Sequence, residues 1–183
     1  CEVPFDDIYG HWAEGYVEEL YCREVVNGKD EDTYDPNSNV TRAEFLKIAL
    51  LNAGYEVDGE AGEEFSDVST GDWFYEYVSY GADQGFIEGY SDSTFRPNDS
   101  INRAEALVII MRIAGEDEYD VDEDWEEFED VDADDWFAYA IELSADAGIV
   151  EGYDNGEFRP ANSITRAEVA AVAVRTYNEY YAD

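Results

Sequence analysis

The chain contains the same five-residue phrase three times, and this repetition constrains its fold more than any other feature. Each copy consists of an apolar residue, then Thr or Asn, and then Arg-Ala-Glu. The arginines of the three copies are Arg42, Arg103 and Arg166. These arginines are 61 and 63 residues apart, and a near-constant period is the signature of tandem structural repeats. Three further landmarks keep the same register: Trp12, Trp73 and Trp136; Gly28, Gly89 and Gly152; Pro36, Pro97 and Pro160.

The repetition divides the 183 residues into three units joined by acidic linkers that are expected to face solvent. A unit of about 50 residues buries too little apolar surface to be stable alone. We therefore expect the units to share one core and to form a single pseudo-threefold domain. The expected boundaries are 1–54, 65–115 and 128–183 for the units, with linkers at 55–64 and 116–127.

The composition is strongly acidic, with 47 acidic residues against ten basic ones. Such a surface repels nucleic acid and anionic lipid, so neither is expected as a partner. Disorder is contradicted by four Trp, fifteen Tyr and nine Phe placed at regular intervals. The folded alternatives are adaptation to a salty habitat and binding of divalent cations. No apolar run approaches the roughly 20 residues that span a bilayer, so no transmembrane segment is expected.

Each unit has the pattern of two helices joined by a loop. In the first unit Trp12, Tyr16 and Leu20 recur at steps of four, which predicts one apolar stripe on a helix. A glycine follows this helix in the other two units, whereas Glu24 in the first unit predicts a helix end of different construction. The second helix is apolar on most faces and is expected to be buried. The predicted fold class is therefore mainly α, with a central bundle of segments 45–51, 106–111 and 169–174 and the Trp helices packed outside it.

The repeated phrase also predicts where each second helix begins. A Thr or Asn followed three residues later by Glu is typical of a capping box, in which each side chain binds the backbone N–H of the other residue. We assign these glutamates to capping. The expected boxes are Thr41 with Glu44, Asn102 with Glu105, and Thr165 with Glu168.

The two cysteines favour an exported protein. Cys22 aligns with Asp83 and Asp146, so its position is expected at the surface, where an extracellular cysteine is usually paired. A disulfide between Cys1 and Cys22, within or between chains, is the preferred interpretation. The alternative is that Cys1 carries a lipid anchor, and both imply that a secretory signal peptide has been removed.

Taken together, these residues resemble the S-layer homology (SLH) domains of bacterial surface proteins. The shared pattern is Phe-x-Asp, a Trp at the first helix, a Gly-containing loop, Phe-x-Pro, and the Ile-Thr-Arg-Ala-Glu helix start, present in all three copies. The resemblance implies a three-pronged spindle at the extracellular bacterial surface. Its grooves between units would hold cell-wall polysaccharide, in the family a secondary wall polymer whose pyruvate ketal carboxylate meets the motif arginine.

The resemblance assigns glycan contact to the motif arginines, because a guanidinium pairs bidentately with a planar carboxylate. The alternative is an intramolecular ion pair with a neighbouring acid. The loop glycines would let the sugar approach the backbone, and the arginines before the second and third repeat prolines join the candidate set. The candidate glycan-binding residues are Arg42, Arg103, Arg166, Arg96, Arg159, Gly28, Gly89 and Gly152.

One groove departs from the pattern of the others. Lys29 stands where the other copies have Tyr90 and Tyr153, and Asp35 replaces the arginine before the proline. The groove of the first unit is therefore expected to differ chemically. The three repeat tryptophans are expected to be core anchors in preference to sugar platforms.

Catalysis is not predicted, because the chain lacks a metal-type His/Cys cluster, a nucleophile-elbow motif and a phosphate loop. An EF-hand beginning at Asp120 is rejected, since Trp125 occupies the place of its glycine. Irregular or intersubunit calcium sites stay open. Their candidate ligands are Asp30 with Asp32 and Asp132 with Asp134.

Two functions follow from these patterns. The first is non-covalent attachment to wall glycan. The second is a self-assembling subunit of an S-layer or extracellular filament, stabilised by disulfides or calcium. In the second case the tyrosines near the C-terminal end of the sequence are candidate contacts with identical subunits: Tyr177, Tyr180 and Tyr181.

Overall fold

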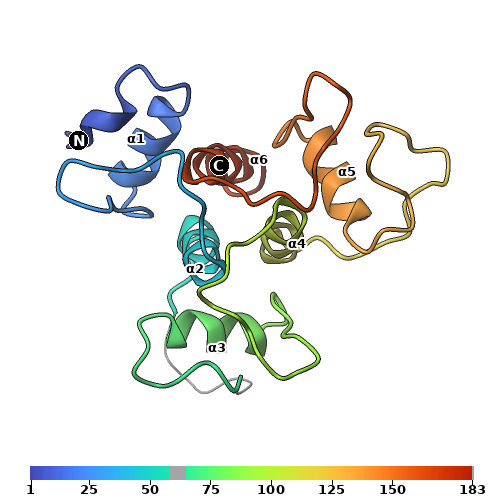
Figure 1. Ribbon diagram of the computed structural model, residues 1–183, viewed down its shortest axis with the longest axis horizontal. Coiled ribbons are helices and arrows are strands. Elements are labelled where there is room, and N and C mark those ends of the chain that lie inside the picture. Colours follow the sequence, from blue (N-terminus) through green and yellow to red (C-terminus); the bar gives the residue numbers. More distant parts are fainter. Residues whose placement is uncertain (58–64, 183) are drawn as a thin grey trace.

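The computed structural model describes residues 1–57 and 65–182, which form six α-helices and a short 3-10 helix at Asp6–Ile8. Three inner helices form a bundle that is seen end-on in Figure 1, and three outer helices surround it. This arrangement confirms the predicted fold class. The inner helices are α2 (Arg42–Asn52), α4 (Arg103–Ala114) and α6 (Arg166–Tyr180), and the outer helices are α1 (Glu14–Cys22), α3 (Tyr75–Asp83) and α5 (Ala138–Asp146).

Each outer helix packs against the inner helix of the preceding repeat. Helix α3 contacts α2, α5 contacts α4, and α1 of the first repeat contacts α6 of the last (Figure 1). The α1–α6 contact closes the three repeats into a ring. A single repeat therefore does not contain its own packed helix pair, which explains why the three units share one core.

A cycle of backbone hydrogen bonds joins the repeats at the hub of this ring. The N–H of Val40 donates to the carbonyl of Ile164, that of Ile164 to Ile101, and that of Ile101 to Val40, with N···O distances of 3.2, 3.2 and 3.0 Å. All three side chains are buried. Because a buried backbone N–H must find a partner, each repeat depends on its neighbours for this bond.

The inner helices begin at the expected capping boxes, and the neighbouring repeat completes each cap. Thr41 accepts a hydrogen bond from the N–H of Glu44, whose carboxylate accepts one from the N–H of Thr41. The first free helical N–H, that of Arg42, donates to the carbonyl of Asp99 in the next repeat at 2.9 Å. Interrepeat bonds of this kind satisfy N–H groups that a helix cannot pair itself. Asn102 with Glu105 and Thr165 with Glu168 form the other two boxes.

The aspartate of the Phe-x-Asp motif holds the loop that leads to each inner helix. The carboxylate of Asp67 accepts the backbone N–H groups of Phe95 and Arg96, both at 2.8 Å. Arg96 has φ 58°, a left-handed conformation that is unfavourable for a residue with a Cβ. Asp7 and Asp130 make the same pair of bonds in the other repeats. The motif thus fixes a strained turn beside the hub.

The first outer helix ends as the other two do, so the expectation of a different construction is wrong. Glu24 adopts φ 60°, close to the values of Gly85 (74°) and Gly148 (68°). The N–H of the residue after Glu24, Val25, donates to the carbonyl of Leu20 at 2.9 Å. This pattern is the hydrogen bonding of a left-handed helix terminus. The glutamate side chain is exposed, so only its backbone has to adapt.

The linkers are less solvent-facing than their acidity predicts. Residues 58–64 of the first lie outside the described residues. The ring of Tyr55 packs on Phe86 with centroids 5.6 Å apart. In the second linker Val121 is buried, and Trp125 packs edge-on against Phe128. Tyr55, Val121 and Trp125 therefore pack in or against the core, while the domain boundaries stay a prediction.

A disulfide joins Cys1 to Cys22 within the chain, with Cα atoms 5.7 Å apart. It ties the N-terminal segment to the last residue of α1. Within residues 1–57 and 65–182, no helix has the length and apolar character needed to cross a bilayer.

Candidate functional site

Two cavities lie where all three repeats meet. The Arg42 groove has a volume of about 270 Å³ and the Arg166 groove about 230 Å³. Each takes its arginine from one repeat, its loop glycine and inner-helix residues from the next, and its tryptophan from the third. Besides its arginine, the Arg42 groove is lined by Ile87, Glu88, Gly89, Tyr90, Glu105, Val108, Ile109, Arg112 and Trp136, and the Arg166 groove by Val25, Val26, Asn27, Gly28, Lys29, Glu44, Lys47, Ile48 and Trp73.

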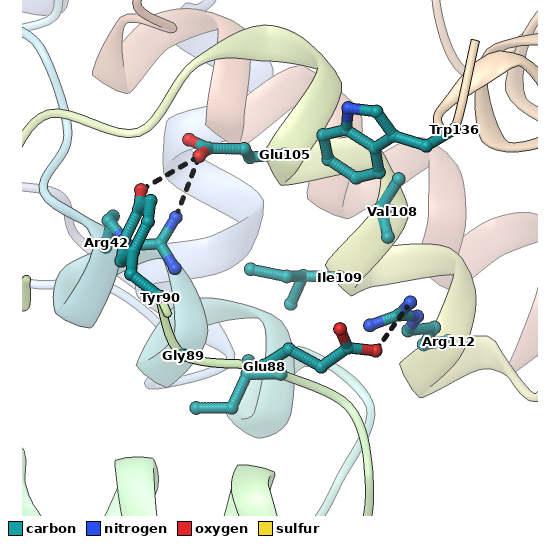
Figure 2. Close-up of a pocket in the computed structure, with 10 residues that line it drawn as sticks. Arg42, Glu88, Gly89, Tyr90, Glu105, Val108, Ile109, Arg112 and Trp136 are labelled. Carbon is teal, nitrogen blue, oxygen red and sulfur yellow. Dashed lines mark hydrogen bonds and ion pairs between the residues drawn. The ribbon is translucent and has the colours of Figure 1, made fainter. Parts of the chain in front are cut away.

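Arg42 is buried in the wall of its groove, where its Nε and Nη1 atoms have partners. Its Nε donates to the carbonyl of Phe95 at 2.9 Å, and its Nη1 lies 3.2 Å from Oε1 of Glu105. The hydroxyl of Tyr90 donates to the same carboxylate oxygen at 3.1 Å (Figure 2). Burial raises the pKa of Tyr90 more than Arg42 lowers it, so the phenol keeps its proton. Glu105 therefore both caps α4 and neutralises the arginine of the preceding repeat.

Arg103 repeats this arrangement. Its Nε donates to the carbonyl of Phe158 at 3.0 Å, and its Nη1 lies 2.9 Å from Oε1 of Glu168. For Arg42 and Arg103 the structure thus contains the intramolecular ion pair that the sequence left open, while glycan contact stays a prediction.

Arg166 differs from the other two. Its Nε and Nη2 donate to the carbonyls of Tyr34 and Asn27, at 2.7 and 2.9 Å. The capping carboxylate of this groove, Glu44, instead pairs with Nζ of Lys29 at 2.9 Å. Burial opposes ionisation of Glu44, but the Thr41 N–H and the Lys29 ammonium outweigh it and hold the pKa of this carboxyl below its usual value. The chemical difference expected for the groove of the first repeat is thus present around Arg166.

The loop glycines are required by packing. A Cβ at Gly89 would overlap the ring of Phe65, the aromatic residue of the Phe-x-Asp motif, and would lie 3.0 Å from the carbonyl oxygen of Thr94. Gly28 faces Phe5 and Gly152 faces Phe128 in the same way. The bare backbone of Gly28 and Gly89 also borders a groove, so the role in sugar approach stays compatible with the packing role.

Replacing Gly89 with alanine is expected to lower the free energy of unfolding by about 2 to 3 kcal/mol, because the new methyl group must displace a packed ring. Gly71 is the matched control, since a Cβ there meets nothing within 4 Å. Urea unfolding of both variants measures the difference. Equal stability of the two would show that the Phe65 ring does not fix the loop.

Arg96 and Arg159 are outside the lining of both grooves. Their guanidinium groups stack on Tyr90 and Tyr153, at 3.8 and 4.0 Å from the ring centroids. Each also pairs with an acid of its own loop at the surface. They support the loop tyrosines from outside, and direct glycan contact by these two arginines stays a prediction.

The repeat tryptophans are not core anchors, and this expectation is wrong. Trp12, Trp73 and Trp136 are 59, 55 and 55% exposed, and the last two line the grooves. The next residue takes the core position in the first two repeats, where Ala13 and Phe74 are buried, and Phe137 of the third is half-buried against the core. A signal was available in the sequence: two large aromatic residues in succession cannot both face the core at the start of a helix. Figure 2 shows Trp136 above the Arg42 groove.

The tyrosines expected to contact identical subunits lie against other parts of this chain. Tyr177 lies under the guanidinium of Arg23, 3.5 Å from ring centroid to Cζ, and the hydroxyl of Tyr181 is buried. These tyrosines thus make contacts within the chain, and self-association stays a prediction.

Across residues 1–57 and 65–182 no three His, Cys, Asp or Glu side chains are grouped to hold a metal ion. Calcium binding by the aspartate pairs is therefore a prediction as well.

Comparison with known proteins agrees with this architecture. The model of a family described as the S-layer homology domain matches residues 4–46, 64–107 and 127–170. The chain is 36% identical over 179 residues to an amylopullulanase of Thermoanaerobacterium thermosulfurigenes, covering 93% of this chain and 9% of that protein. It is 30% identical over 176 residues to the surface-layer 125 kDa protein of Lysinibacillus sphaericus, covering 94% and 14%. It is also 36% identical over 119 residues to a cellulosome-anchoring protein of Acetivibrio thermocellus, covering 60% and 26%. The chain thus spans 9 to 26% of the length of these relatives.

Proposed function

Because the chain belongs to the S-layer homology family, we propose that it attaches non-covalently to bacterial cell-wall glycan through the grooves between its repeats. Its three repeats make it a cell-surface anchoring module of the kind found in S-layer proteins and surface-anchored enzymes. One observation carries the proposal. The same constellation of exposed tryptophan, bare glycine backbone and buried arginine is built twice, from equivalent positions, around an open groove.

The constellation suits a saccharide chemically. An exposed indole offers a flat apolar face to the C–H face of a sugar ring. Opposite it, the carboxylate of Glu105 and the hydroxyl of Tyr90 are placed to orient sugar hydroxyls in the Arg42 groove. Cavities of these volumes suit a short stretch of glycan, with the rest of the polymer outside.

The proposal assigns no reaction to the chain. The three repeats fill residues 4–170 apart from the linkers, and the amylopullulanase shares its similarity with this chain over 9% of its own length. Enzymatic activity of such relatives is therefore not transferred. In the extracellular setting that the proposal implies, an oxidised Cys1–Cys22 pair is the expected state.

Replacing Trp136 with alanine is expected to weaken binding to purified wall polymer about tenfold, because truncating a central aromatic contact costs more than 1 kcal/mol. The same change at Trp73 tests the second groove. Both side chains are more than half exposed, so the fold should survive, and circular dichroism checks this. Pull-down on wall polymer is the measurement.

Tyr9 provides the control, since it is 88% exposed and lines neither groove. Its alanine variant should bind as the parent does. Unchanged binding when both Trp73 and Trp136 are replaced would refute the grooves as the glycan site.

A further inference from the structure

Two arginines contact the ring of the loop tyrosine in the second repeat. The guanidinium carbon of Arg42, which is buried in the groove wall, lies 5.1 Å from the centroid of the Tyr90 ring. The guanidinium carbon of Arg96, which is at the surface, lies 3.8 Å from the same centroid. A guanidinium over an aromatic face within about 6 Å attracts the ring. Tyr90 is therefore held by one cation of the groove wall and by a closer one outside the groove.

The third repeat contains the same contacts, and the first repeat lacks them. Tyr153 lies 4.0 Å from Arg159 and 5.3 Å from Arg103. In the first repeat the tyrosine is replaced by Lys29, and the arginine before the proline is replaced by Asp35. The surface arginine is thus present in the two repeats that have the loop tyrosine and absent from the one that does not.

The turn itself does not require an arginine. Asp35 has φ 61°, and Arg96 and Arg159 have φ 58° and 60° at the equivalent position. The same left-handed backbone therefore forms with an aspartate. What the arginine adds is its contact with the tyrosine ring.

The side chain of Arg96 is fixed by its own loop. Its Nη2 donates to Oδ2 of Asp92 at 3.2 Å, and its Nε donates to the hydroxyl of Thr94 at 3.3 Å. Its backbone N–H donates to the carboxylate of Asp67 at 2.8 Å. Because the backbone and the guanidinium are both anchored, Arg96 offers the Tyr90 ring a defined surface.

The position of the ring decides where the phenol points. The hydroxyl of Tyr90 donates to Oε1 of Glu105 at 3.1 Å, and Nη1 of Arg42 lies 3.2 Å from the same oxygen (Figure 2). Tyr90 and Glu105 line the Arg42 groove, whereas Arg96 lies outside its lining. Tyr90 is only half-buried and belongs to a loop, so its place in the wall depends on these few contacts.

We propose that Arg96 is a positioning residue of the Arg42 groove, which keeps the hydroxyl of Tyr90 on Glu105 and the groove wall ready to bind saccharide. The inference rests on the proposed function and deepens it, because it gives a residue outside the groove a part in binding. Without Arg96 the ring spends time outside the wall, and the apparent affinity falls with the fraction of molecules in which the wall is formed. The strength of an exposed cation–π contact limits this fall to about two- to fivefold.

Pull-down over a range of wall-polymer concentrations tests the inference in two backgrounds. In Trp73→Ala, binding depends on the Arg42 groove, and adding Arg96→Ala should weaken it about two- to fivefold. In Trp136→Ala, binding depends on the Arg166 groove, and adding Arg96→Ala should change nothing. Arg96→Lys keeps the charge but not the planar group, so it should restore part of the loss.

A double-mutant cycle separates positioning from direct contact with the polymer. If Arg96 acts through the ring, Arg96→Ala should cause no further loss of binding in a chain that already carries Tyr90→Ala. If Arg96 instead contacted the polymer itself, the loss would be the same with and without the ring. That result would overturn the inference.

The mobility of the ring provides a measurement that needs no ligand. In nuclear magnetic resonance relaxation of ¹³C-labelled tyrosine rings, Arg96→Ala should raise the picosecond-to-nanosecond mobility of Tyr90. Arg159→Ala is the matched control, because it removes the same contact from Tyr153 and should leave Tyr90 unchanged.

Two further results would overturn the inference: an unchanged Tyr90 ring in Arg96→Ala, or unchanged polymer binding when Arg96→Ala is added to Trp73→Ala. Binding of the parent chain separates this failure from that of the proposed function. If the parent binds polymer, either result refutes the inference alone. If the parent does not bind, both are refuted.

Discussion

Replacing Arg103 with alanine is expected to lower the free energy of unfolding by about 3 kcal/mol, the lower end of the range for breaking a buried ion pair. Arg103 is 8% exposed, and its guanidinium joins two repeats through the Phe158 carbonyl and the Glu168 carboxylate. Its loss removes the Nε donor from the Phe158 carbonyl and the cation from Glu168, whose carboxylate keeps only its capping bonds to Thr165. It also opens space beside the Phe158 ring, whose centroid is 4.5 Å from the guanidinium carbon. Urea unfolding followed by circular dichroism measures the change.

Arg96 is the matched control for this experiment. Its side chain is 43% exposed and its ion pair with Asp92 is at the surface, so its alanine variant should change stability by no more than about 0.5 kcal/mol. If Arg103→Ala were as stable as Arg96→Ala, the interrepeat ion pair would not hold the ring. Because Arg42 and Arg103 also hold neighbouring repeats together, substitution of the exposed tryptophans tests glycan binding with less effect on the fold.

Removing the Cys1–Cys22 bridge is expected to cost about 3 kcal/mol, the loop-closure value for a cross-link of about 20 residues. The sequence separation is 21, and the cross-link limits the freedom of the unfolded N-terminal segment. Replacing both cysteines with serine and measuring thermal unfolding tests this. In the parent chain, added reductant should reproduce the effect.

The double serine variant is also the control for the reductant, which should leave its unfolding temperature unchanged. A parent chain whose stability does not respond to reduction would show that the bridge contributes nothing to the closed ring.

The parts of the fold that depend on local pattern could be predicted from the sequence. The capping boxes at Thr41, Asn102 and Thr165 follow from residues three apart, and the inner helices follow from their apolar faces. The alignment of Cys22 with two exposed aspartates predicts a surface position and favours a Cys1–Cys22 pairing, but only the structure shows that the bond forms within the chain. Each of these predictions uses either residues that are close together in one repeat or one position compared between repeats.

The parts that depend on contacts between repeats could not be predicted. The buried residues of α1, Val17 and Leu20, are compatible with packing on any inner helix, and only the structure shows that α1 covers α6. Likewise, Glu105 is recognisable as a cap, but its second role as the partner of Arg42 arises across a repeat boundary. The Trp136-Phe137 pair indicates that one aromatic side chain faces away from the core, but only the structure shows that Trp136 lines a groove built from all three repeats.

Hydrogen exchange at the amides of Val40, Ile101 and Ile164 tests most directly whether the grooves belong to one closed ring. These amides form the cycle of bonds at the hub, and each groove needs all three repeats. We predict that all three exchange with the same free energy, equal to that of global unfolding. Exchange of one amide through a separate, lower-energy opening would show that a repeat unfolds alone, and would contradict the account.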